Sequence, residues 1–194
     1  MGLIHLYTGD GKGKTTAAIG LAVRAAGAGK KVVFAQFMKG RETSELKILS
    51  NVPEITIIRN DKDLGWFKKD DEAQVKAYTE VHNKILDEIE TFIMNDECDV
   101  LILDEATYPY NYGIIDKERL ENLIDLSVGK GVDREESESD ENPADSATYV
   151  GPEIVVTGRD ADSFFAERAD YITEMKKIRH PYDKGIDGRL GIEF

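Results

Sequence analysis

The stretch LIHLYTGDGKGKTT at residues 3–16 constrains the fold more than any other part of the chain. It begins with a short apolar run at residues 3–7, and the sequence that follows it, AAIGLAVRAAGAG, has the small and apolar residues that suit a helix. The predicted order is therefore strand, glycine-rich loop and helix. In such a loop the backbone N–H groups face inward and the helix N-terminus adds partial positive charge, so the loop can hold a polyphosphate.

The loop is close to the Walker A pattern G-x-x-x-x-G-K-[ST] but departs from it at one position. When G-K-[ST] is aligned with residues 13–15, the first glycine of the pattern falls at residue 8. This chain has Thr8 there, followed by Gly9. Three glycines remain free to adopt positive φ and let phosphate oxygens approach, namely Gly9, Gly11 and Gly13. Lys14 is expected to reach the outer phosphates. A glycine-rich turn with an incidental lysine is the alternative.

Two adjacent carboxylates follow the strongest strand signal in the chain. Residues 99–104 read DVLILD, and Asp104 and Glu105 stand at the carboxyl end of that predicted strand. Ligands of doubly wound sheets gather at the carboxyl ends of strands, where the glycine-rich loop also lies. We therefore predict a Mg²⁺ (or Mn²⁺) site made by Thr15, Asp104 and Glu105. The alternative is a buried strand that ends in two solvated acids.

The predicted nucleotide site combines these two stretches. Its ATP-binding residues are Thr8, Gly9, Asp10, Gly11, Lys12, Gly13, Lys14, Thr15, Thr16 and Glu105.

The remaining pattern alternates between strands and helices. Further strands are predicted at residues 31–37, 55–58, 153–157 and 171–173, and helices at 42–50, 72–95, 117–127 and 161–168. We predict an α/β fold of the P-loop NTPase (RecA-like) type, with a mostly parallel sheet of about six strands flanked by helices. Residues 1–194 are expected to form a single domain, with an acidic surface insert at residues 129–147.

Composition excludes several classes of partner. The 25 basic and 38 acidic side chains give a formal charge of −13, which argues against nucleic acid and against an anionic membrane surface. No apolar run is long enough to span a bilayer and no leader precedes the first strand, so we expect a cytoplasmic protein. Cys98 is the only cysteine and is predicted to be a half-buried structural thiol, and His82 a packing or surface residue.

Aromatic residues are unusually placed in two polar stretches. Residues 59–71 are turn-rich except for Leu64, Trp66 and Phe67. Residues 106–116 carry three tyrosines that either line a planar ligand or belong to a packed loop, namely Tyr108, Tyr110 and Tyr112. The tail at residues 174–194 is basic and contains Pro181, which favours an ordered segment over a free one.

Five segments in this order resemble the bacterial ATP:corrinoid adenosyltransferases of the CobA/BtuR/CobO type. They are TGDGKGKTTAAIGLAVRAAGAGKKV, QFMKG, LILDEATYPYNYGIID, VVTGR and TEMKKIRHPYDKGIDGRLGIEF. The similarity covers almost the whole chain except residues 129–147. The resemblance implies transfer of the 5′-deoxyadenosyl group of ATP to the Co(I) centre of a reduced corrinoid with release of triphosphate. The reaction belongs to adenosylcobalamin biosynthesis or corrinoid salvage. It also implies a homodimer and an electron donor such as reduced flavodoxin.

The resemblance also implies roles for particular residues. Co(I) is a strong nucleophile, so the protein must hold C5′ in line and stabilise the departing triphosphate, which assigns a catalytic role to Lys14. In the family, an aromatic loop after the third strand removes the lower axial ligand of cobalt and so eases its reduction. Here that loop reads Leu64-Gly65-Trp66-Phe67. The family spacing is not kept, so the catalytic role falls to Trp66 and Phe67 as a pair, and core packing is the alternative.

Two other functions are compatible with the motifs. A generic P-loop ATPase or phosphotransferase would attack the γ-phosphate and release ADP. A non-enzymatic, ATP-dependent corrinoid carrier would bind its cargo without forming a cobalt–carbon bond.

Overall fold

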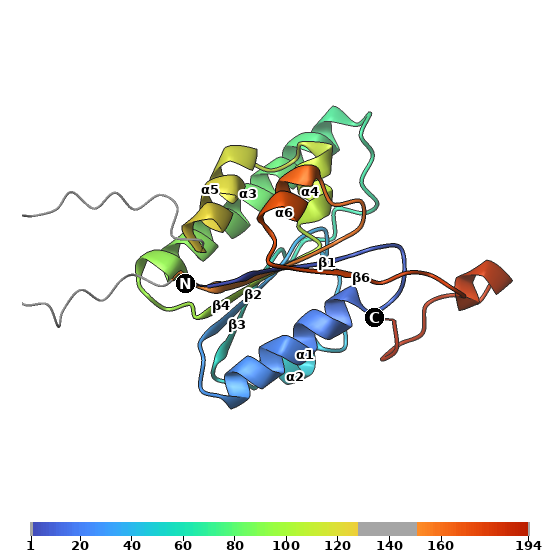
Figure 1. Ribbon diagram of the computed structural model, residues 1–194. Helices are drawn as coiled ribbons and strands as arrows, with labels where there is room; N and C mark the ends of the chain where they lie inside the picture. The colour runs from blue at the N-terminus through green and yellow to red at the C-terminus, as the bar shows by residue number, and fades with distance from the viewer. Residues whose placement is uncertain (1, 128–150, 194) are drawn as a thin grey trace, which may run out of the picture.

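The computed structural model describes residues 2–127 and 151–193 (Figure 1). Within these ranges it has one sheet, all of whose strand pairs are parallel, in the order β3-β2-β4-β5-β1-β6. Its strands are β1 (Ile4–Thr8), β2 (Val32–Gln36), β3 (Ile55–Arg59), β4 (Val100–Asp104), β5 (Glu153–Thr157) and β6 (Tyr171–Glu174). The predicted α/β fold with about six strands is confirmed for the described part of the chain. The predicted acidic insert at residues 129–147 lies outside the described residues.

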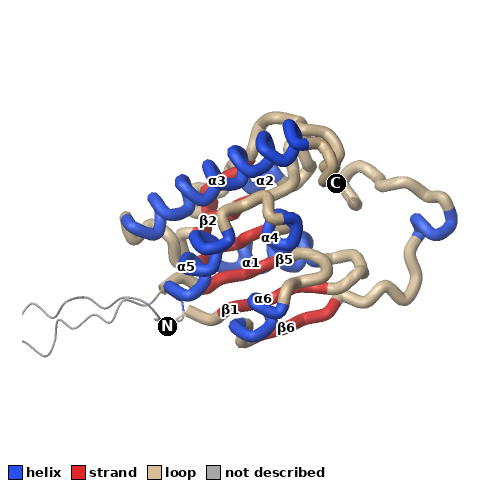
Figure 2. Tube along the Cα trace, turned by 90° about the horizontal axis from the view of Figure 1, so that it is seen from above, coloured by secondary structure: helices blue, strands red, loops and turns tan. Residues whose placement is uncertain are grey.

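Helices cover both faces of the sheet. In Figure 1, α1 (Lys14–Gly27) and α2 (Leu46–Leu49) lie on one face, and the other helices lie on the opposite face. The helices of the opposite face are α3 (Glu72–Met94), α4 (Thr107–Tyr112), α5 (Lys117–Ser127) and α6 (Ser163–Arg168). Figure 2 looks down on that second face, where α3 lies towards β2 and α6 towards β6. Two apolar clusters, one on each side of the sheet, form the core.

The central strands are apolar on both faces, as buried parallel strands are. Every residue of β2 and of β4 is buried, whereas every residue of the edge strand β6 is exposed. Register pairs Gln36 with Asp104 and Tyr7 with Thr157. The carboxyl ends of β1, β2, β4 and β5 therefore meet at one edge of the sheet, and the predicted site residues follow from these ends.

Two stretches differ in secondary structure from the interpretation of the sequence. The helix predicted at residues 42–50 is reduced to α2, four residues long. The stretch at residues 106–116, for which a packed loop was one of two interpretations, contains helix α4. Pro109 is the third residue of α4, where a missing N–H costs nothing, and Gly113 closes the helix at φ 66°. Pro and Gly at these two positions are the signal of a short helix in that stretch.

The segment after β6 packs on the glycine-rich loop and then leaves the body. Met175 N donates to Thr8 O at 2.8 Å, and the chain continues through a 3₁₀ helix at Pro181–Lys184 (Figure 1). Residues 191–193 return to the body of the protein and line a cavity beside α1. No helix in the described ranges is long and apolar enough to cross a membrane.

Candidate functional site

The glycine-rich loop joins β1 to α1 and folds around the Lys14 side chain. Gly9 and Gly13 have φ of 97° and 119°, a region that side chains with a Cβ rarely adopt. Lys14 Nζ donates to Gly9 O and to Gly11 O, at 2.7 Å each. Burial, followed by repulsion from Arg159, lowers the pKa of Lys14. The ammonium is thus held over the loop, where it can meet an anionic ligand.

Gly11 serves a purpose different from the predicted one, because its φ is not positive. Its N–H donates to Met175 O at 2.6 Å, and a Cβ at this position would lie 2.5 Å from the same oxygen. Next to it, Asp10 Oδ1 accepts a hydrogen bond of 2.8 Å from Lys177 N, and that bond lowers the pKa of Asp10. The outer side of the loop is therefore fixed by the segment that follows β6.

Asp104 is the buried centre of the site. None of its side chain is exposed, and it accepts three hydrogen bonds. Thr15 Oγ1 and Thr157 Oγ1 each donate to its Oδ1 at 2.8 Å, and Lys39 Nζ donates to its Oδ2 at 2.7 Å. The structure thus brings together Thr15 and Asp104, two of the three residues predicted to bind a metal ion.

Glu105, the third of these residues, is held in an unusual backbone conformation. Its φ is 63°, which costs free energy for any residue with a Cβ, and its N–H donates to Thr157 Oγ1 at 2.9 Å. Burial raises the pKa of its carboxyl group, and Lys39, 3.7 Å away, opposes this effect. Strain of this kind is commonly kept at functional sites.

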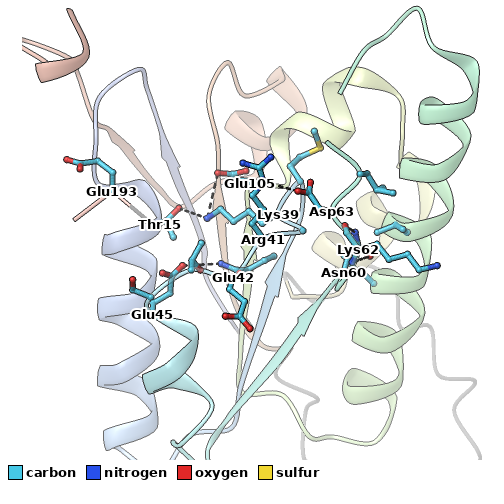
Figure 3. Close-up of a pocket in the computed structure, with 18 of the residues that line it drawn as sticks. Thr15, Lys39, Arg41, Glu42, Glu45, Asn60, Lys62, Asp63, Glu105 and Glu193 are labelled. Atoms are coloured by element: carbon cyan, nitrogen blue, oxygen red, sulfur yellow. Dashed lines mark hydrogen bonds and ion pairs between the residues drawn. The ribbon is translucent and has the colours of Figure 1, made fainter. Parts of the chain in front are cut away.

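Lys39 is a site residue that sequence reasoning did not single out. It follows β2, and its ammonium contacts Asp104. Figure 3 shows the same ammonium beside Glu105 and Thr15, with Thr15 Oγ1 at 3.4 Å. Burial alone would lower the pKa of Lys39, but attraction to the two carboxylates outweighs it, so the pKa is raised. The one feature of the sequence that could have identified Lys39 is its position just beyond the carboxyl end of β2, the strand next to β4.

A cavity of about 940 Å³ opens from this cluster. It runs from the start of α1, past the ends of β2 and β4, to α3 (Figure 3). The end near α1 is polar. The end near α3 is lined by the largely apolar side chains Leu64, Trp66, Tyr78, Val81 and Ile85. Its volume is at the upper end of the range for small-molecule sites.

The structure separates the two aromatic residues of the 59–71 loop. Trp66 lines the cavity with 86% of its surface exposed. Phe67 stacks on Tyr112, with ring centroids 5.1 Å apart, and meets the edge of Tyr78 at 5.3 Å. Trp66 is thus available to a ligand, whereas Phe67 packs against neighbouring rings.

Three other residues singled out in the sequence have structural contacts. His82 is buried between Met38 N and Ile114 O, and burial lowers its pKa to about 4. Burial raises the pKa of Cys98 to about 12, as expected for a structural thiol. Tyr110 is buried and donates a 2.6 Å hydrogen bond to Glu121.

The oxygen atoms of the site suit a hard cation that is bound partly by the protein and partly by a ligand. Across residues 2–127 and 151–193, no three His, Cys, Asp or Glu side chains are placed to hold a metal ion by themselves. Thr15 Oγ1, Asp104 and Glu105 instead offer a hydroxyl and two carboxylates beside the phosphate loop. Mg²⁺ is commonly bound by one or two carboxylates together with phosphate oxygens, so these residues fit that ion.

Comparison with known proteins agrees with this geometry. The family described as ATP:corrinoid adenosyltransferase BtuR/CobO/CobP matches residues 1–131 and 147–194. The corrinoid adenosyltransferase of Escherichia coli is 28% identical over 195 residues, covering 100% of this chain and 86% of the relative. Corrinoid adenosyltransferase CobA of Salmonella typhimurium is 27% identical with the same coverage.

A solved structure, the cytoplasmic domain of EssC, is similar with a TM-score of 0.49 and 16% identity, over 97% of this chain and 34% of that one. The family match extends over both described ranges and includes the phosphate loop, the acid pair and the lysine between them. This chain belongs to the ATP:corrinoid adenosyltransferase family.

Proposed function

We propose that one cavity holds both substrates of the corrinoid adenosyltransferase reaction, with the triphosphate of ATP at its polar end and the corrinoid at its apolar end. The observation that carries this proposal is the layout of the cavity. Thr15 and Thr16, which follow the phosphate loop, line one end together with Lys39 and Glu105, and Trp66 with the largely apolar side chains of α3 lines the other. The 5′ carbon of ATP would lie between the two ends.

The reaction needs no base from the protein. The lone pair of Co(I) attacks C5′, a cobalt–carbon bond forms, the C5′–O bond breaks, and its electron pair leaves with triphosphate. Negative charge builds on the leaving group, and Lys14 and Lys39 are half-buried cations of the site that can balance it. Mg²⁺ or Mn²⁺, when bound, would supply further positive charge through Thr15, Asp104 and Glu105.

Trp66 is the residue we propose to contact the corrinoid. Its exposed ring lies at the rim of the apolar end, where it can cover one face of a macrocycle and displace an axial ligand of cobalt. Phe67 would act by holding the loop through its contacts with Tyr78 and Tyr112. A reduced flavodoxin or a similar donor would supply the electron, and we further propose a homodimer that works in the cytoplasm.

An anaerobic assay with ATP and chemically reduced cobalamin tests the proposal. We expect the absorption spectrum of the cobalt–carbon bond to appear with one triphosphate released for each bond. Release of ADP and orthophosphate would instead indicate a phosphotransferase. Stoichiometric corrinoid binding without a new bond would indicate a carrier.

A further inference from the structure

Two loops that line the cavity are in contact with each other. One follows β2 and carries Lys39, and the other follows β3 and carries Trp66. Register pairs the last residues of these strands, Gln36 and Arg59, so the two loops leave the sheet side by side. Lys39 belongs to the polar end of the cavity and Trp66 to the apolar end. Contacts between the loops therefore relate the two ends of the cavity in space.

Gly40 allows the backbones of the two loops to approach closely. It follows Lys39, and a Cβ at this position would lie 2.2 Å from Lys62 O and 2.9 Å from Asp63 Cα. Asn60 holds that carbonyl in place, because Asn60 Nδ2 donates to Lys62 O at 2.5 Å and Asn60 Oδ1 accepts from Lys62 N at 3.0 Å. Non-bonded atoms do not approach to 2.2 Å, so any side chain in place of Gly40 would push the loops apart.

Arg59 fastens the turn around Gly40 to the end of β3. Its Nη2 donates to Arg41 O at 2.5 Å and to Lys39 O at 3.4 Å, on either side of the glycine. The guanidinium is planar and rigid, so these bonds restrict the orientation of the turn as well as its distance from the strand. The backbone of Lys39 is therefore held against the strand from which the loop of Trp66 starts.

An ion pair continues the connection towards Trp66. Arg41 Nε donates to Asp63 Oδ2 at 2.9 Å (Figure 3), and Gly65 N donates to Asp63 Oδ1 at the same distance. The Gly65 N–H and, next to it in effect, Arg41 lower the pKa of Asp63. Tyr78 OH donates to Gly65 O at 2.7 Å. The residue before Trp66 is thus held both by the ion pair and by α3.

We propose that Gly40, Arg41 and Asp63 position Trp66 relative to Lys39, an inference that rests on the proposed function because it takes Lys39 to balance the triphosphate and Trp66 to contact the corrinoid. Attack on C5′ requires cobalt, C5′ and the leaving oxygen to lie in line, and a misplacement of about 1 Å can cost about a hundredfold in rate. The three residues act through Lys39 and Trp66 and are positioning residues.

The rate of cobalt–carbon bond formation in a single turnover tests the proposal, with saturating MgATP and chemically reduced cobalamin under anaerobic conditions. Gly40→Ala should slow this step by at least about tenfold. The dissociation constant of MgATP, measured by calorimetric titration, should change by less than about threefold, because the phosphate loop is not altered. Gly20→Ala is the matched control, since a Cβ at Gly20 on α1 meets nothing within 4 Å, and it should leave the rate unchanged.

The ion pair offers a milder and independent perturbation. Asp63→Asn removes the charge but keeps an acceptor for Gly65 N–H, and it should slow the transfer step about threefold, as should Arg41→Met. Arg41→Lys keeps the charge and should retain most of the rate. Lys76→Met breaks an exposed ion pair with Glu80 on α3 and should leave the rate unchanged. If Gly40→Ala does not fold, the ion-pair variants decide the outcome.

Trp66 reports directly on its own loop, because it is the only tryptophan of the chain. The steady-state anisotropy of its fluorescence, measured without substrates, shows how firmly the loop is held. It should fall in Gly40→Ala and Asp63→Asn and stay unchanged in Gly20→Ala and Lys76→Met. A contact that serves stability alone would instead lower the melting temperature and leave both the anisotropy and the transfer rate of the folded protein unchanged.

An unchanged transfer rate in folded Gly40→Ala and Asp63→Asn would overturn the positioning role without affecting the proposed adenosyl transfer. A loss of rate accompanied by the same loss in Gly20→Ala and Lys76→Met would also overturn it. Failure of the unmodified chain to form a cobalt–carbon bond would overturn the proposed function together with the positioning role, so the two failures are distinguishable.

Discussion

The ammonium of Lys39 lies 2.7 Å from Asp104 Oδ2, although the two residues are 65 positions apart in the chain. The Asp104 side chain has no exposed surface, and 18% of the Lys39 side chain is exposed. This ion pair ties the loop after β2 to the end of β4, and it places a cation beside the predicted metal-binding residues. Its removal should therefore affect both the stability of the chain and its chemistry.

Substituting Lys39 with Met should lower the free energy of unfolding by about 3–5 kcal/mol, because it leaves a buried carboxylate without its cation. Urea unfolding followed by circular dichroism measures this change. The double variant Lys39→Met/Asp104→Asn should recover most of the loss, since both charges are then absent. Lys68→Met, at an exposed position, is the matched control and should change stability by less than about 0.5 kcal/mol. Additive losses in the double variant would contradict the ion-pair explanation.

The backbone conformation of Glu105 should lower the stability of the folded chain. Its φ of 63° favours glycine, so Glu105→Gly should be more stable than Glu105→Ala by about 1 kcal/mol in urea unfolding. Both variants lack the carboxylate and should lose adenosyl transfer. The same pair of substitutions at Glu72, in the first turn of α3, should give the opposite order, because glycine is unfavourable in a helix. Equal stability of the two Glu105 variants would show that the conformation carries no strain.

Local sequence patterns predicted the parts of the site that lie close together in the chain. The strand, loop and helix around Lys14 and the acids after β4 follow from periodicity, and parallel strands must bring their carboxyl ends to one edge. Lys39 did not stand out, because a lysine in a loop has no distinctive pattern. Its contacts depend on which strands are neighbours, and strand order is not encoded locally.

The contact between Gly11 and Met175 shows the same limit. The sequence indicated that Gly11 is free to adopt positive φ, but in the structure this glycine allows close approach of the segment after β6. The two roles predict different effects of a side chain at this position, and only the tertiary contact distinguishes them. Tertiary contacts likewise distinguish Phe67 from Trp66, because Phe67 packs against Tyr78 and Tyr112.

Trp66 and Phe67 should respond differently to substitution. Trp66→Ala should leave the melting temperature unchanged, since 86% of the side chain is exposed, but slow adenosyl transfer by at least about tenfold. Phe67→Ala should lower the free energy of unfolding by about 1–2 kcal/mol, because it removes two aromatic contacts. The visible spectrum of a bound Co(II) corrinoid with ATP reports axial ligation and checks the Trp66 role. An unchanged spectrum and rate in Trp66→Ala would argue against corrinoid contact.

His82 should make stability depend on pH in a defined window. Its pKa is about 4 in the folded chain, against 6.5 for an unperturbed histidine, so the unfolded chain binds more protons between these values. The contribution of His82 to stability should be constant above about pH 7 and fall as the pH decreases from about 6.5 towards 4. At pH 5 the loss attributable to His82 is roughly 2 kcal/mol. Urea unfolding at several pH values, compared with His82→Gln, isolates this contribution from those of the carboxylates, because a glutamine amide can form hydrogen bonds but does not titrate. A parallel pH dependence in the two proteins would mean that His82 is not held neutral in the folded chain.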